Sequence, residues 1–195
     1  MTREILIYFD YKSPYTFVGK APAYALEAEY GVRLTWLPYA IDLSEMTEPQ
    51  RAAHAMRKIR YLYMDARRFA KPQGLTIRGP ERIFDSTPAL IGMLFAQAHG
   101  KLRPYHDWVF ERFFKRAFDV GDAAQVEALL SEAGVATEEF REFAAGEGRT
   151  KLERIRVEAE QRGVFGVPTF VLDGELFWGQ DRLPLVRKRL EGAGA

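Results

Sequence analysis

The sequence predicts an α/β fold in which a small sheet is interrupted by a long, all-helical insertion. Two observations carry this prediction. Runs rich in aromatic and branched apolar residues occur near the two ends of the chain, and between them apolar side chains recur at helical spacing. The chain has 195 residues, of which 47% are apolar and 13% aromatic, enough to bury one well-packed core.

The first elements are predicted to form a β-α-β unit. Residues 4–10 are rich in Ile, Tyr and Phe and are typical of a buried strand. Ser13, followed by proline, indicates the start of a helix, because Ser is favoured at the N-cap and Pro at the first helical position. The helix is expected to end at Tyr30, before Gly31, and residues 32–39 form the second strand. A helical crossover between two strands implies parallel pairing.

The rest of the chain is predicted to be helical and then to return to strands. Residues 49–162 favour about five helices, separated by segments that contain glycine or proline. Residues 168–173 and 175–178 favour a hairpin, because Asp-Gly between β-rich runs is a strong turn signal, and residues 181–190 favour a final helix. This order is the thioredoxin-like plan.

Two units follow from that plan. Residues 1–45 together with 163–195 are expected to form the thioredoxin-like domain, and residues 46–162 the inserted helical domain, an arrangement of the DsbA-like type.

Charge and cysteine content exclude several classes of function. Lys and Arg number 28 and Asp and Glu 27, so no strong field attracts nucleic acid or an anionic membrane. The absence of cysteine excludes disulfide exchange and thiolate metal sites, and His54, His99 and His106 lack metal-ligand spacing. The apolar run at residues 5–9 is too short for a signal peptide, so a cytoplasmic protein is expected.

Three segments of the chain resemble a single family. Residues 10–15 (DYKSPY), 163–170 (GVFGVPTF) and 177–183 (FWGQDRL) are similar to the motifs of kappa-class glutathione transferases and 2-hydroxychromene-2-carboxylate isomerases. Lys58, Tyr61, Asp65 and Arg68 lie in similar positions on the helix between them. The C-terminal motif resembles the isomerase branch more closely.

The resemblance implies a site for glutathione or another low-molecular-weight thiol. Ser13 occupies the place of a catalytic cysteine, and its hydroxyl would stabilise a bound thiolate; the motif alone favours a plain helix cap, and the resemblance reverses that preference. A cis bond between Val167 and Pro168 would present the Val167 backbone to the peptide backbone of glutathione. The alternative is a trans proline at the start of a strand.

Further residues of the thiol site are implied in the same way. Gln180 and Asp181 would hold the γ-glutamyl end of glutathione, although Asp181 also suits a helix cap. Lys58 would meet the glycyl carboxylate; otherwise it is a solvated helix charge. Asp65 and Arg68 share a helix face, which favours a structural ion pair.

A small aromatic substrate needs apolar walls. The candidate wall residues are Tyr11, Tyr15, Tyr39, Phe84 and Trp178, although aromatic residues in such places commonly belong to a core. Residues 44–50 and 78–88 depart from the family pattern and are expected to shape the substrate cavity.

The leading functional hypothesis is a glutathione-dependent isomerase, similar to 2-hydroxychromene-2-carboxylate isomerase, in which Ser13 stabilises the thiolate. Two alternatives stay open at this point: a kappa-type glutathione transferase, and a redox-inactive binding or chaperone module with a thioredoxin fold. The resemblance also implies a homodimer.

Overall fold

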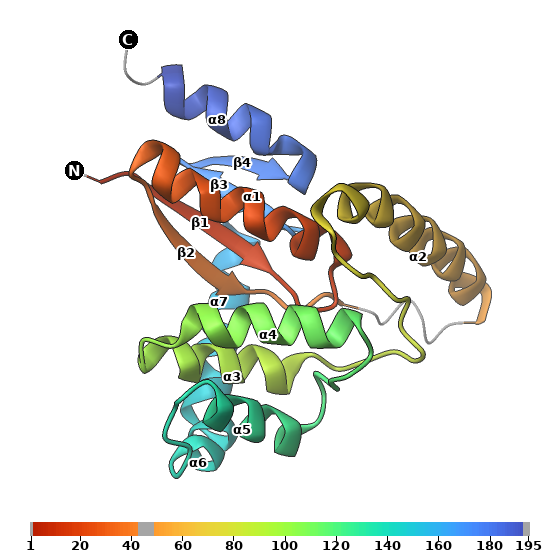
Figure 1. The fold of residues 1–195 in the computed structure, drawn as a ribbon, viewed down its shortest axis with the longest axis vertical. Helices are drawn as coiled ribbons and strands as arrows, with labels where there is room; N and C mark the ends of the chain where they lie inside the picture. Colours follow the sequence, from red (N-terminus) through yellow and green to blue (C-terminus); the bar gives the residue numbers. More distant parts are fainter. Residues whose placement is uncertain (1, 43–48, 193–195) are drawn as a thin grey trace.

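The sheet of the molecule is built from both ends of the chain. The computed structural model describes residues 2–42 and 49–192, so the expected boundary after residue 45 and most of segment 44–50 lie outside the described residues. The strands are β1 (Glu4–Phe9), β2 (Arg33–Pro38), β3 (Thr169–Leu172) and β4 (Glu175–Trp178). Their order is β2-β1-β3-β4, with β1 and β2 parallel and the other pairs antiparallel, which confirms the thioredoxin-like plan (Figure 1).

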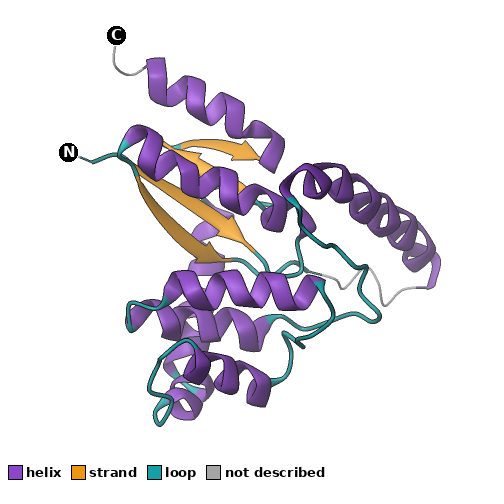
Figure 2. Ribbon diagram, in the orientation of Figure 1, coloured by secondary structure: helices purple, strands orange, loops and turns teal. Residues whose placement is uncertain are grey.

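Helices make up most of the remainder (Figure 2). Helix α1 (Pro14–Tyr30) joins β1 to β2, and α8 (Leu183–Glu191) follows β4 after the 3₁₀ turn η3 (Gln180–Arg182). The helical insertion contains α2 (Pro49–Ala70), the short η2 (Lys71–Gln73), α3 (Thr87–Ala98), α4 (Leu102–Phe114), α5 (Ala123–Glu132), α6 (Phe140–Ala145) and α7 (Glu147–Gln161). The described insertion, from residue 49 on, therefore contains six α-helices, whereas the sequence predicts about five, because α6 and α7 are separated only at Gly146.

The sheet half and the helical insertion share one core. Helices α1 and α8 lie over one face of the sheet and α7 lies behind it (Figure 1). Phe17 of α1 stacks on Phe114 of α4 at 4.9 Å between ring centroids, and Phe9 of β1 meets His106 of α4 edge-on at 4.6 Å. These aromatic contacts fix the insertion against the strand that leads into Ser13.

Within residues 2–42 and 49–192, no helix has the length and apolar character that crossing a membrane requires.

A proline inside α1 creates a link between α1 and the insertion. Pro22 has no backbone N–H, so the carbonyl of Val18, four residues earlier, has no donor from its own helix. The side-chain amide of Gln73 donates to that carbonyl at 3.0 Å and to the Phe69 carbonyl at 3.1 Å. Gln73 therefore ties the end of α2 to the middle of α1.

Replacing Gln73 with alanine is expected to lower the free energy of unfolding by about 1 kcal/mol, because the Val18 carbonyl loses its donor. Urea unfolding followed by circular dichroism measures this change. Gln161→Ala, at the exposed end of α7, serves as the matched control and is expected to leave the midpoint unchanged. Equal midpoints for the two variants would contradict the proposed link.

Candidate functional site

The loop before α1 is held by a buried carboxylate. Asp10 is fully buried, and its side chain accepts hydrogen bonds from the backbone N–H groups of Lys12 at 2.9 Å and Ile41 at 2.6 Å. The Lys12 ammonium lies 3.5 Å from the same carboxylate, and the Ser13 N–H donates to the Asp10 carbonyl at 3.0 Å. This set of bonds fixes where Ser13 stands between β1 and α1.

Ser13 caps α1 and still has a hydrogen to donate. Its Oγ accepts from the backbone N–H of Thr16 at 3.1 Å, as the sequence predicts for an N-cap. Its hydroxyl donates to the carbonyl of Val167 at 3.4 Å, a long and therefore weak bond. No acidic residue occupies the first turn of α1, so the positive end of the helix is not neutralised there. Ser13 is only 3% exposed, which favours contact with a narrow group such as a thiol.

The segment before β3 lies against Ser13. The peptide bond between Val167 and Pro168 is cis, as the resemblance implies. Thr169 Oγ1 donates to the carbonyl of Gly166 at 2.6 Å, which fixes the turn. A Cβ at Gly166 would lie 2.7 Å from Nε1 of Trp178, so only glycine lets the indole pack on this backbone.

The turn that carries Gln180 and Asp181 is attached to the same segment. The Gly179 N–H donates to the Pro168 carbonyl at 2.8 Å, and Gly179 has a positive φ of 108°. Gln180 packs on α1 at Gly19, where an added Cβ would lie 2.8 Å from the Cβ of Gln180. The side chain of Asp181 is 55% exposed and 3.5 Å from that of Arg182, so its carboxylate is accessible to a ligand.

A polar network joins α1 to α2 beside this turn. The Tyr15 hydroxyl donates to Asp65 at 2.7 Å, and Arg68 forms the expected ion pair with Asp65 at 2.8 Å. Burial and the hydrogen bond to Asp65 raise the pKa of Tyr15, and the negative charge of Asp181 contributes to the same shift. Tyr15 therefore stays protonated and lies within electrostatic range of Asp181.

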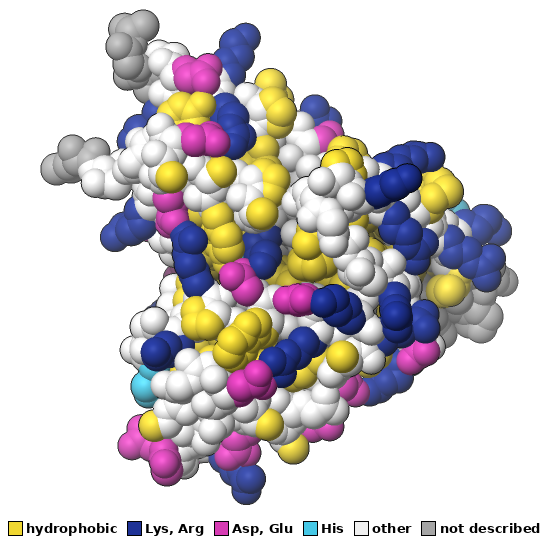
Figure 3. All heavy atoms as spheres, in the orientation of Figure 1, with side chains coloured by type: hydrophobic (Ala, Val, Ile, Leu, Met, Phe, Trp, Pro, Cys, Tyr) yellow, Lys and Arg dark blue, Asp and Glu magenta, His cyan; other side chains and the backbone are white. Residues whose placement is uncertain are grey.

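The surface of α2 is strongly basic. Lys and Arg side chains gather over α2 on the right of Figure 3. Lys58 of this helix is exposed. Among the side chains of α2 that the structure describes, the exposed cations are Arg57, Lys58, Arg60, Arg67 and Arg68. Because the whole chain carries a net charge of only +1, this local excess favours an anionic group next to α2.

The structure places the five predicted wall residues in different surroundings. Trp178 is 54% exposed and Tyr15 is half-buried, so both have surface beside the cis-proline segment or α1. Tyr39 is half-buried; burial and the negative charge of Glu160 raise its pKa, whereas Arg156 opposes the shift, and both charged residues belong to α7. Phe84 packs edge-on against Phe113, 5.4 Å between centroids, in the loop before α3.

Tyr11 differs from its expected role as a wall. Its side chain is fully buried, and its hydroxyl lies 3.1 Å from Nδ1 of His106. Its ring packs edge-on against Phe9 and Phe110, so no face is turned toward a ligand. The motif around Tyr11 does not reveal that α4 of the insertion covers this position.

Two residues of interest were not predicted from the sequence. Phe165 is 68% exposed and packs edge-on against Trp178, 4.7 Å between centroids, which makes an accessible aromatic pair beside the cis-proline segment. It lies inside the family-like segment 163–170, so that motif offered a signal. His106 gave none, because a lone histidine in a helical pattern does not indicate burial.

His106 is a buried, neutral histidine. Burial lowers its pKa well below the usual value, and the positive charges of Lys20 and Arg103 lower it further. Its Nε2 has no hydrogen-bond partner among the described residues. Burial and these two cations therefore oppose protonation of His106 in the folded protein.

Stability is therefore expected to fall as the pH drops below about 6.5, because the unfolded chain binds a proton that the folded His106 excludes. The loss approaches about 1.4 kcal/mol per pH unit for this one proton. Urea unfolding between about pH 5 and about pH 8 measures it. His106→Phe is expected to flatten this slope and His99→Asn, at an exposed position, to leave it unchanged. Identical slopes in all three proteins would contradict the assignment.

The described residues contain no candidate metal-binding site. Among the described residues, no group of three or more His, Asp or Glu side chains is arranged to hold an ion.

The molecule therefore has a thioredoxin fold with a helical insertion, and Ser13 stands at the start of α1. The sequence matches the family described as DSBA-like thioredoxin domain over residues 4–191, and the chain belongs to this family.

Three similar proteins add detail. The chain is 24% identical to the 2-hydroxychromene-2-carboxylate isomerase of Sphingobium xenophagum, over 97% of this chain and 99% of that protein. A solved structure of 2-hydroxychromene-2-carboxylate isomerase superposes with a TM-score of 0.79 at 24% identity, covering 97% of this chain and 95% of the other. The cytosolic disulfide reductase DsbM from Pseudomonas aeruginosa, in a structure with GSH, superposes with a TM-score of 0.61 at 17% identity, covering 96% and 99%.

Proposed function

We propose that this protein is a glutathione-dependent isomerase that acts on a small aromatic substrate of the 2-hydroxychromene-2-carboxylate type. One observation carries the proposal: a serine caps α1 and contacts the carbonyl before a cis proline, in a chain without cysteine. Because a protein thiol is lacking, the nucleophilic sulfur has to come from a small molecule. The similarity to isomerases over nearly the whole chain supports the same reaction.

The residues near Ser13 fit the groups of glutathione. The half-buried Val167 lies in the bend that leads into β3, and its backbone suits pairing with a peptide. The exposed carboxylate of Asp181 suits an ammonium group, and the basic surface of α2, including Lys58, suits a carboxylate. The DsbM structure with GSH supports thiol binding by this fold.

Bound glutathione would supply the sulfur that adds to the substrate and leaves again after isomerisation. Ser13 donates its hydroxyl hydrogen to the sulfur, exchanging the 3.4 Å bond to Val167 for a charge-assisted one. Lowering a thiol pKa by about 2 units takes about 2.7 kcal/mol. A helix N-terminus contributes about 0.3–2 kcal/mol and a hydrogen bond to a charged group about 1.5–3 kcal/mol. The two effects together are therefore large enough.

Aromatic surface beside the sulfur position favours a planar substrate. Phe165 and Trp178 form an exposed edge-on pair adjacent to the cis-proline segment, and both rings retain accessible area. An aromatic substrate gains contact area there without displacing polar side chains.

The test is an assay of isomerisation of 2-hydroxychromene-2-carboxylate with and without glutathione. Turnover that requires glutathione while total glutathione stays constant supports the proposal. Formation of a stable conjugate with a chloronitrobenzene, without isomerisation, would indicate the transferase instead. No turnover and no binding of glutathione would leave a binding module as the better description.

Asp181→Asn is expected to weaken glutathione binding about tenfold or more, because an ammonium group loses the charge of its partner. Isothermal titration calorimetry measures the change. Asp173→Asn is the matched control, since its carboxylate is also exposed but pairs with Arg3 at the far end of β3. Equal weakening by both variants would contradict a specific role for Asp181.

A further inference from the structure

A concave surface lies on the helical insertion. It is a cavity of about 370 Å³, within the range of small-molecule sites. Its walls come from the loop between η2 and α3, the end of α4 and the start of α5. None of the lining residues belongs to α1, β3 or η3, so the cavity and the thiol site use different parts of the chain.

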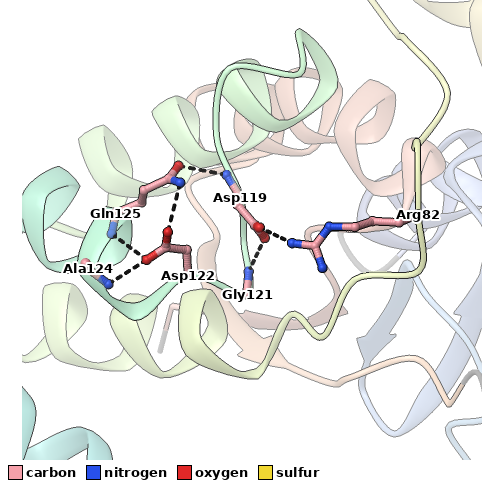
Figure 4. A network of polar contacts seen from close by, with 6 residues as sticks. All are labelled: Arg82, Asp119, Gly121, Asp122, Ala124 and Gln125. Atoms are coloured by element: carbon pink, nitrogen blue, oxygen red, sulfur yellow. Dashed lines mark hydrogen bonds and ion pairs between the residues drawn. The ribbon is translucent and has the colours of Figure 1, made fainter.

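The residues that line the cavity include three arginines and three phenylalanines. Arg82 pairs with Asp119, whose carboxylate also accepts from the Gly121 N–H at 2.9 Å, in the network drawn in Figure 4. Arg116 donates to Glu81 at 2.9 Å and to the Gly79 carbonyl at 2.8 Å. Both of these guanidinium groups are therefore fixed by the cavity's own acidic residues.

The third arginine has no carboxylate partner among the lining residues, all of which the structure describes. Within residues 2–42 and 49–192, the Arg78 side chain has one hydrogen-bond acceptor, the carbonyl of Lys115, at 3.5 Å, which is long for a hydrogen bond. The lining residues carry three positive charges, on the arginines, and two negative charges, on Glu81 and Asp119. One positive charge is therefore uncompensated at this surface. A guanidinium in this state is suited to bidentate pairing with a carboxylate.

The apolar part of the cavity favours a flat ring next to that charge. Phe84 is half-buried and packs edge-on against Phe113. The guanidinium of Arg82 lies 4.5 Å from the centre of the Phe84 ring, an arrangement in which a planar ligand can stack on the outer face of the guanidinium.

We propose that this cavity is a second binding site, for a planar aromatic monoanion whose carboxylate pairs with Arg78 and whose ring stacks beside Arg82 and Phe84. The charge count selects a monoanion over a neutral or a doubly charged ligand. Its lining residues differ from those of the thiol site, so the two are tested separately.

The experiment titrates cinnamate, a planar aromatic carboxylate, into the isotopically labelled protein and follows backbone amide shifts by NMR. We expect saturable shifts centred on residues 78–84 and 113–119. Arg78→Gln is expected to weaken binding at least tenfold. Two control variants, Arg149→Gln at an exposed position on α7 and Ser13→Ala, are expected to keep the affinity for cinnamate. Phe84→Leu, which keeps an apolar side chain, is expected to weaken binding several-fold.

Four outcomes would overturn the proposal. They are the absence of saturation at millimolar cinnamate, shifts centred on residues 163–182, unchanged affinity in Arg78→Gln, and equal binding of the neutral analogue cinnamamide. Because the Ser13→Ala protein is titrated in parallel, failure of the proposed isomerase function does not alter the reading of this test.

Discussion

Replacing Ser13 with alanine is expected to lower the rate of glutathione-dependent isomerisation about 10- to 100-fold. The variant removes the hydroxyl that, under the proposed function, donates to the thiolate, a charge-assisted bond of about 1.5–3 kcal/mol. The pKa of the bound thiol should rise at the same time by about 1–2 units, so activity recovers in part at higher pH. Steady-state kinetics across the pH range measures both effects.

Alanine at this position also removes a helix cap, which costs stability of about 1 kcal/mol. Ser13→Gly separates the two roles, because glycine at an N-cap costs only a few tenths of a kcal/mol while lacking the hydroxyl. The account predicts that both variants lose activity to the same extent although only Ser13→Ala loses appreciable stability. Full activity in Ser13→Gly would show that the hydroxyl is needed for the fold alone.

Replacing Gly92 with alanine is expected to destabilise the protein by about 3 kcal/mol. In most helices this change is favourable by about 1 kcal/mol. Here the added Cβ would lie 2.6 Å from Val126 Cγ1 and 2.9 Å from Tyr105 Cζ. Tyr105 is fully buried, and moving it breaks the bond from its hydroxyl to the Ala89 carbonyl at 3.0 Å. Thermal and urea unfolding measure the loss.

Gly192→Ala is the control for that change. A Cβ at Gly192 meets no atom within 4 Å, so the midpoint of unfolding should stay the same. A stable Gly92→Ala protein would mean that α3, α4 and α5 can separate without cost, which contradicts the close packing seen among them.

The elements that follow from local chemistry are the ones the sequence predicts well. Ser13 and the following proline start α1, and Gly31 ends it with a left-handed φ of 64°. The turn at Asp173 and Gly174 joins β3 to β4 as expected, because these positions have positive φ. In such cases a few neighbouring residues decide the backbone conformation.

Positions that depend on distant segments were harder to predict. Tyr11 is buried because α4 brings His106 and Phe110 onto it, and those contacts join residues 95 or more positions apart. The hydrogen bond from the Gln73 side chain to the Val18 carbonyl likewise depends on a distant segment. That carbonyl lacks a donor within α1 because Pro22 has no N–H. For the candidate site, the motifs predicted which segments lie near Ser13, whereas the exposure of Phe165 and the burial of Tyr11 follow only from the packed structure.

The most direct test of the central claim is a titration of the thiol of bound glutathione. Because the chain contains no cysteine, the ultraviolet absorbance of thiolate reports on glutathione alone. With the protein in excess, the account predicts a thiol pKa well below the free value of about 8.5, and a return toward that value in Ser13→Ala. The same pKa in both proteins would contradict the role assigned to Ser13, and a pKa equal to that of free glutathione would contradict the thiolate site itself.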